Sequence, residues 1–191
     1  MMKLSNKHYW HYFLAIEDDF VKALRYVDLD DANMDTFSIE FARIILAVGS
    51  EIDVLAKVLC KEHSLSIMPE NIEGYRKAIT AKFNGFVELE VMILRAERSV
   101  KPWESWCEDK SPSWWKAHND VKHERNVNFK QATLKNTLEA MAGLFVLVCY
   151  VCQKELRSNA VLLPQLLSLD PQLSSRISND LRPGFTLPDF K

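Results

Sequence analysis

The sequence feature that most constrains the fold is an apolar run, AMAGLFVLVCYVC, at residues 140 to 152. Its thirteen residues fall short of the roughly 17–25 that a helix needs to cross a bilayer. The run lies within a longer stretch, 129 to about 157, whose apolar positions recur at helical spacing: Leu134, Leu138, Met141, Phe145, Val148 and Cys152. We therefore expect a long helix buried in a core, started by Asn126 or Asn128, and no membrane partner.

Three further segments show a helical pattern of apolar residues, at 5–27, 37–63 and 72–83. Asp35 or Thr36 is placed to cap the second of these helices, and Asn71 is placed to cap the third. The Gly49-Ser50 pair in the middle of the second helix lacks side-chain bulk. We expect a neighbouring helix to approach closely at that point.

Residues 86 to 94 alternate apolar and acidic side chains, which favours a short strand or extended arm over a continued helix. The chain has only five glycines and seven prolines, which argues against a barrel or a sandwich, because those folds need many tight turns. The prediction is an all-α or mainly α domain of about five helices over residues 1–157. A proline-containing extension, 158–191, would either pack on this body or be mobile.

The charge and the cysteines exclude some functions and predict a compartment. A formal net charge of -2 means that any nucleic-acid site must be a local patch. Cys149 and Cys152 form a C-x-x-C motif within the apolar helix, where cysteines usually serve as small core residues. With no second C-x-x-C and no secretory signal in the sequence, we expect no metal, no cofactor and a cytoplasmic location.

The stretch SPSWWKAHNDVKHERN, residues 111 to 126, combines two tryptophans, two histidines and several cations. It should form a helix to about Arg125, with Ser111 as its cap and Pro112 in its first turn. At 100° per residue, His118, Lys122 and Arg125 form one basic stripe, and Asn119 and His123 form an adjoining polar pair. Trp114, Ala117 and Val121 form the apolar side.

Such a set of residues suits RNA cleavage by the 2′-hydroxyl, which requires a base, an acid and positive charge near the phosphate. Histidine can serve in either proton transfer, and lysine or arginine can hold the phosphate. Metal binding is less favoured, because His118 and His123 are five residues apart and helical zinc pairs favour i, i+4. A helix with tryptophans inside and solvated charges outside is the alternative.

The segment WWKAHNDVKHERNVNFKQATLKNTLEAMAGLFVL resembles the signature region of the HEPN superfamily, all-α domains of prokaryotic RNA-targeting systems. The family signature is an arginine, a polar residue, three further residues and a histidine. Here the matching string is HNDVKH, with Asn119 at the polar position and His123 at the histidine. His118 stands where the family has arginine.

The resemblance implies a HEPN-like helical bundle that acts as a metal-independent endoribonuclease, in a toxin–antitoxin or phage-defence setting. It implies RNA and a cognate antitoxin or other protein as partners, and a homodimer in which two signatures line one cleft. His123 would be the acid or base, with Asn119 as its polar partner and His118 in the arginine's place. The cations predicted to bind RNA are Lys122, Arg125 and Lys116, and the supporting acids are Glu51 and Asp53.

The substitution of His118 for arginine leaves an alternative open. Arginine is always charged and can hold a phosphate through two parallel bonds, whereas histidine is mostly neutral at pH 7 unless an acid raises its pKa. The alternative is a catalytically inactive module of the same fold that binds RNA, a nucleotide or a protein. Convergence of Lys122 and Arg125 with His123 in a groove would favour the nuclease. A buried His123 whose neighbours point to bulk water would favour the binding module.

Overall fold

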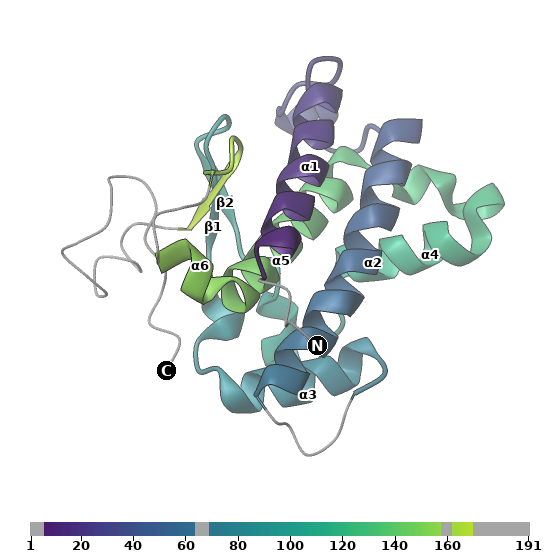
Figure 1. Ribbon diagram of the computed structural model, residues 1–191. Helices are drawn as coiled ribbons and strands as arrows, with labels where there is room; N and C mark the ends of the chain where they lie inside the picture. The colour runs from purple at the N-terminus through teal and green to yellow at the C-terminus, as the bar shows by residue number, and fades with distance from the viewer. Residues whose placement is uncertain (1–5, 64–68, 158–161, 170–191) are drawn as a thin grey trace.

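The computed structural model describes residues 6–63, 69–157 and 162–169 and confirms a mainly α fold. Figure 1 shows α1 (Lys7–Ala23) and α2 (Ile39–Glu62) side by side, with α5 (Leu134–Val151) behind them. α3 (Ile72–Lys82) lies at one end and α4 (Ser113–Asn128) at one side. A short helix α6 (Gln153–Arg157) follows α5. Short 3-10 turns occupy Asp31–Asn33, Phe86–Glu88, Glu104–Glu108 and Phe129–Gln131.

The apolar run does form the central helix. Every residue of α5 from Ala140 to Val151 is buried, and α2 is the helix packed most extensively against it. α5 is long and apolar enough to span a membrane, but 83% of it is buried inside the protein, which is typical of a core helix. Cys149 and Cys152 are buried as expected, and their burial raises the pKa of both thiols, so both stay protonated at neutral pH.

The helix caps were only partly predicted. Asn71 caps α3 by accepting a 2.9 Å hydrogen bond from the Gly74 amide, as expected. Ser38 caps α2, so the prediction of Asp35 or Thr36 is wrong. Thr133 caps α5, so the prediction of Asn126 or Asn128 is also wrong. An antiparallel bridge between Phe37 and Thr133 explains both corrections, because it keeps the backbone extended up to these later starting points.

A small antiparallel sheet lies beside the helices (Figure 1), in the order β2-β1-β3. β1 (Val91–Ile93) confirms the strand expected within 86–94 and pairs with β2 (Arg98–Val100). Its other edge pairs with β3 (Leu167–Leu169), where Val91 faces Leu169. The buried Glu17 carboxylate on α1 accepts backbone N–H bonds of 2.8, 3.0 and 3.2 Å from residues 165 to 167. Residues 162–169 therefore pack on the body, and 170–191 lie outside the described residues.

Candidate functional site

The first turn of α4 anchors the helix in the core. α4 begins at Ser113 with Pro112 in the cap position, so the expected cap by Ser111 is wrong. Pro112 has an extended ψ of 145°, which delays the first helical residue to Ser113. Trp114 is 1% exposed, and its indole N–H donates a 2.9 Å hydrogen bond to the Pro102 carbonyl. These contacts determine which faces of α4 turn toward α5 and α2.

His118 is the residue of α4 that approaches α2, at the glycine where the sequence predicted a close approach. The side chain is 3% exposed, and a Cβ built on Gly49 would overlap three atoms of the imidazole and lie 2.6 Å from its Cε1. The ring thus occupies the space that any larger residue at position 49 would fill. Gly49 is therefore what allows α2 and α4 to pack around a histidine.

A groove opens above this contact, between α2, α4 and the start of α3, with a volume of about 670 Å³. We call it the α2–α4 groove. Beside Gly49 and His118, its polar and aromatic lining comes mainly from Ser50, Asp53 and Lys57 of α2 and Trp115, Asn119 and Lys122 of α4. The Trp115 and His118 rings are in contact, with centroids 5.0 Å apart. The groove therefore combines an aromatic side chain, an amide and charges of both signs.

His118 is a neutral group in this site at physiological pH. Burial lowers its pKa to about 4, and the nearby Lys122 and His123 act in the same direction. Its Nδ1 atom is buried and has no hydrogen-bond partner among the residues that the structure describes. The imidazole therefore lacks the permanent charge that an arginine would carry at this position.

The two predicted supporting acids are separated. Asp53 lines the groove and accepts hydrogen bonds of 2.7 Å from the Tyr75 hydroxyl and 2.6 Å from Lys57 Nζ. Although burial acts to raise the pKa of Asp53, these hydrogen bonds and the Lys57 and Lys122 charges lower it, so the carboxylate stays ionised. Glu51 is buried outside the groove lining, where desolvation raises its pKa and the charge of His8 lowers it. Asp53 is thus the one of the two acids that lines the groove with His118.

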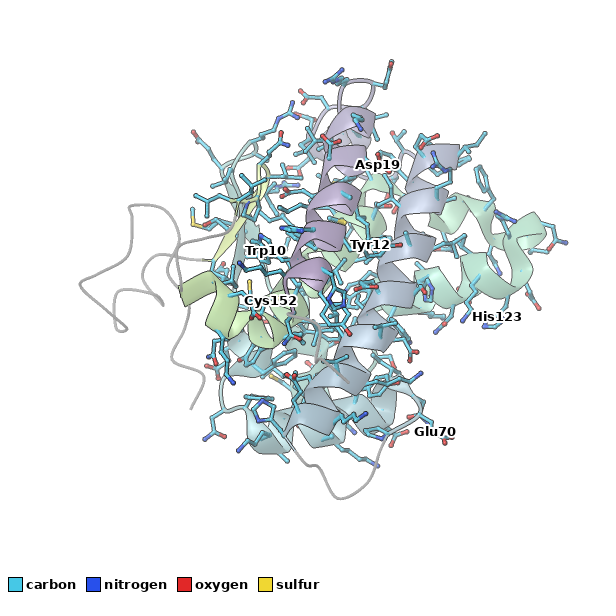
Figure 2. All side chains as sticks on the ribbon, in the orientation of Figure 1. Trp10, Tyr12, Asp19, Glu70, His123 and Cys152 are labelled. Atoms are coloured by element: carbon cyan, nitrogen blue, oxygen red, sulfur yellow. The ribbon has the colours of Figure 1, made fainter. Side chains whose placement is uncertain are left out.

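The predicted basic stripe is divided by a break in α4. Glu124 has non-helical angles of φ -135° and ψ 50°, so Arg125 does not continue the row of His118 and Lys122. His118 is buried, Lys122 lines the groove and Arg125 is exposed beyond the break. Lys116 and His123 are also exposed and lie outside the groove lining, and Figure 2 shows His123 on α4 at the margin of the molecule.

Sequence reasoning missed several members of the site, and three of them matter most for its chemistry. Trp115, Lys57 and Tyr75 either line the groove or orient Asp53. The i, i+4 spacing of Asp53 and Lys57 was a local signal for their ion pair. The Tyr75 contact had no such signal, because it joins residues of α2 and α3. In the described residues, no cluster of three or more His, Cys, Asp or Glu side chains could hold a metal ion.

Comparisons of the chain with protein-family models, curated proteins and solved structures find no match. The HEPN resemblance therefore stays a prediction that rests on the residues quoted above.

Proposed function

We propose that this protein is a HEPN-like RNA-binding module that does not cleave RNA through its signature histidines. The observation that carries the proposal is His118, which stands in the arginine's place and is 3% exposed, packed on Gly49 and neutral at pH 7. A neutral imidazole does not hold a phosphate as arginine does. The charge of the signature arginine is then missing, and Lys122 is the cation that remains beside His118 in the groove.

Proton transfer by His118 is disfavoured for the same reason. An efficient acid or base has a pKa near the working pH, and that of His118 is lowered to about 4. At neutral pH it carries no labile acidic proton, and its ring is covered by α2. The protonated form needed for the second half of an acid–base cycle is scarce.

RNA binding is supported by the groups that remain accessible around α4. Trp115 is half-buried, and Lys122 lines the groove at its exposed side. Lys116, His123 and Arg125 are exposed nearby on the same helix. Aromatic platforms combined with local cations are the usual means of holding a single strand, and the cations act through the phosphates. A cytoplasmic, prokaryotic RNA-targeting setting belongs to the same proposal.

The second candidate function is the metal-independent endoribonuclease, and a specific observation favours it. His123 is exposed one helical turn from Asn119, with Lys122 adjacent, so an RNA phosphate could reach all three. A homodimer that placed two such histidines in one cleft would supply both an acid and a base. This candidate requires the second copy, whereas RNA binding does not.

One experiment separates the two candidates. Fluorescently labelled single-stranded and hairpin RNAs are incubated with the protein in EDTA, and binding is followed by anisotropy and cleavage on denaturing gels. We expect binding without cleavage, weakened by Lys122→Ala, with an affinity that falls as salt rises.

The control pair is His123→Ala and His11→Ala, since both histidines are exposed but His11 lies on α1. Cleavage by the wild type that disappears in His123→Ala and persists in His11→Ala would establish the endoribonuclease instead. Failure to bind any of the RNAs would overturn the RNA-binding proposal.

A further inference from the structure

We propose that the open edge of strand β2 binds an extended peptide, which adds to the sheet as a further strand and places a basic side chain against Glu139. The sheet order is β2-β1-β3, so β2 lies at the edge and pairs only with β1 among the described residues. None of the β2 residues lines the α2–α4 groove, so this inference does not depend on the proposed RNA binding.

The register of the sheet determines which backbone groups of β2 face away from β1. The Leu94 amide donates a 2.9 Å hydrogen bond to the Leu166 carbonyl, on the β3 side of the sheet. Because the bonding direction alternates along an antiparallel strand, the neighbouring Ile93 bonds to β2, where its partner is Arg98. Ser99, the next residue, therefore directs its N–H and C=O to the open edge. Unpaired groups at a sheet edge are a template for another strand.

Two adjoining hollows follow this edge. They have volumes of about 360 and 280 Å³, and Val100 of β2 and Glu139 of α5 line both of them. We call the two hollows together the β2 furrow. Met34 and Leu138 add apolar lining to the first hollow, and Trp114 adds it to the second. An extended peptide directs alternate side chains to one face, so a strand added to β2 would place every second side chain in the furrow.

Glu139 supplies the charge that selects the peptide. One oxygen of its half-buried carboxylate accepts a 3.3 Å hydrogen bond from Ser113 Oγ, and the other has no partner within the described part of the chain. Burial raises the pKa of Glu139, although the Lys135 charge and the Ser113 hydrogen bond act to lower it. In the same hollow the Ser105 hydroxyl oxygen is buried and unpartnered among the described residues. A lysine or arginine side chain carries the charge and the donors that these oxygens lack.

The other charges of the furrow do not take this role. Arg98 is paired with Asp31 across the first hollow. The remaining charged side chains of the lining are exposed and balance in sign: Asp35, Lys101, Glu104 and Lys135. Among the described residues, Glu139 is thus the charged group of the furrow that is half-buried and has no ion-pair partner. A peptide that brings a cation to it is favoured over a neutral or acidic one.

The test selects peptides from a random heptapeptide library displayed on phage, with the full chain as the target. We expect the selected peptides to share a lysine or arginine with apolar side chains at i−2 and i+2, because these three positions face the furrow. Fluorescence anisotropy of labelled synthetic copies measures their affinities. Replacement of the basic residue of a peptide by glutamine should weaken binding to the wild type about tenfold.

Two pairs of variants locate the peptide. Glu139→Gln should bind the basic peptide and its glutamine version equally, whereas Glu108→Gln, at an exposed carboxylate outside the furrow lining, should keep the difference. Ser99→Pro removes the N–H that faces the open edge and leaves the bonds to β1, so it should abolish binding. Ser99→Ala keeps this N–H, loses only the hydroxyl contact with Glu90, and should bind as the wild type does. Circular dichroism confirms that each variant is folded.

Three outcomes would overturn the proposal. The first is a selection that enriches no peptide, or only peptides without a basic residue. The second is a set of affinities that change in neither Glu139→Gln nor Ser99→Pro. The third is self-association of the chain, measured by analytical ultracentrifugation, that Ser99→Pro abolishes and Ser99→Ala retains, since it would place a second copy at this edge in place of a peptide.

Discussion

Two contacts of α4, one turn apart, each pack an aromatic ring against a glycine of a neighbouring helix, but they differ in how their polar atoms are paired. Trp114 packs on Gly143 of α5, and His118 packs on Gly49 of α2. In the first contact the polar atoms are satisfied: Trp114 donates to Pro102 at 2.9 Å, and Trp103 donates to the Gly143 carbonyl at 3.2 Å. In the second, His118 Nδ1 has no partner among the described residues.

The difference separates a contact whose buried polar atoms are paired from one that leaves a buried polar atom unpaired among the described residues. An unsatisfied buried polar group costs about 1–3 kcal/mol, so it persists where function or a ligand compensates. We call the Trp114 contact closed, because its buried polar atoms are paired, and the His118 contact open, because His118 lines the α2–α4 groove. Substitutions at the two contacts should therefore change the free energy of unfolding, and its dependence on pH, in different ways.

The largest loss of unfolding free energy is expected at the closed contact of Trp114. Trp114→Ala removes a buried indole and should lower the free energy of unfolding by about 3–5 kcal/mol. Urea denaturation followed by far-UV circular dichroism measures the loss. Trp115→Ala is the matched control, because the neighbouring indole is only half-buried and should lose less. Equal losses in the two variants would contradict the distinction between the closed contact and the groove.

Acidification should lower the contribution of His118, at the open contact, to the free energy of unfolding by up to about 3 kcal/mol. The pKa of His118 is about 4 in the folded protein, below the ordinary histidine value of 6.5. The unfolded chain therefore takes up the proton first as pH falls. The stability contributed by neutral His118 is full above pH 6.5 and is lost as pH falls toward about 4.

The measurement is the unfolding free energy of the wild type minus that of His118→Gln between pH 7.5 and 4. Buried Glu17 acts in the opposite sense, because its raised pKa favours the folded state at low pH, and the subtraction removes its contribution. His11→Gln, at an exposed position, is the control. A difference that stays constant across this pH range would show that His118 is not buried in its neutral form.

The smallest expected effect is the coupling between Gly49 and His118. Gly49→Ala should destabilise the wild type by about 1–3 kcal/mol through overpacking. In a His118→Ala background the new methyl group has room, so the loss should shrink by about 1 kcal/mol or more. Gly143→Ala is the control, since its Cβ would lie 2.9 Å from Trp114 and should not couple to His118. If Gly49→Ala and Gly143→Ala coupled equally to His118→Ala, the close contact between Gly49 and His118 would not be the cause of the coupling.

Local pattern in the sequence was sufficient for much of the fold. The apolar run predicted the central helix, the spacing of apolar residues predicted the other helices, and Gly49 predicted a close approach by a neighbour. These features depend on residues within a few turns of one another, which share one periodicity. The cap at Asn71 and the strand within 86–94 could be predicted for the same reason.

Only the tertiary structure decided the chemistry of α4. The helical wheel placed His118, Lys122 and Arg125 in one stripe, but burial under α2 made the first neutral and the break at Glu124 displaced the third. Likewise, the bridge between Phe37 and Thr133 keeps the backbone extended, so that α2 and α5 are capped by Ser38 and Thr133 and not by the residues predicted from the sequence. Periodicity assigns a residue to a face, while its charge and accessibility depend on what a distant segment places against that face.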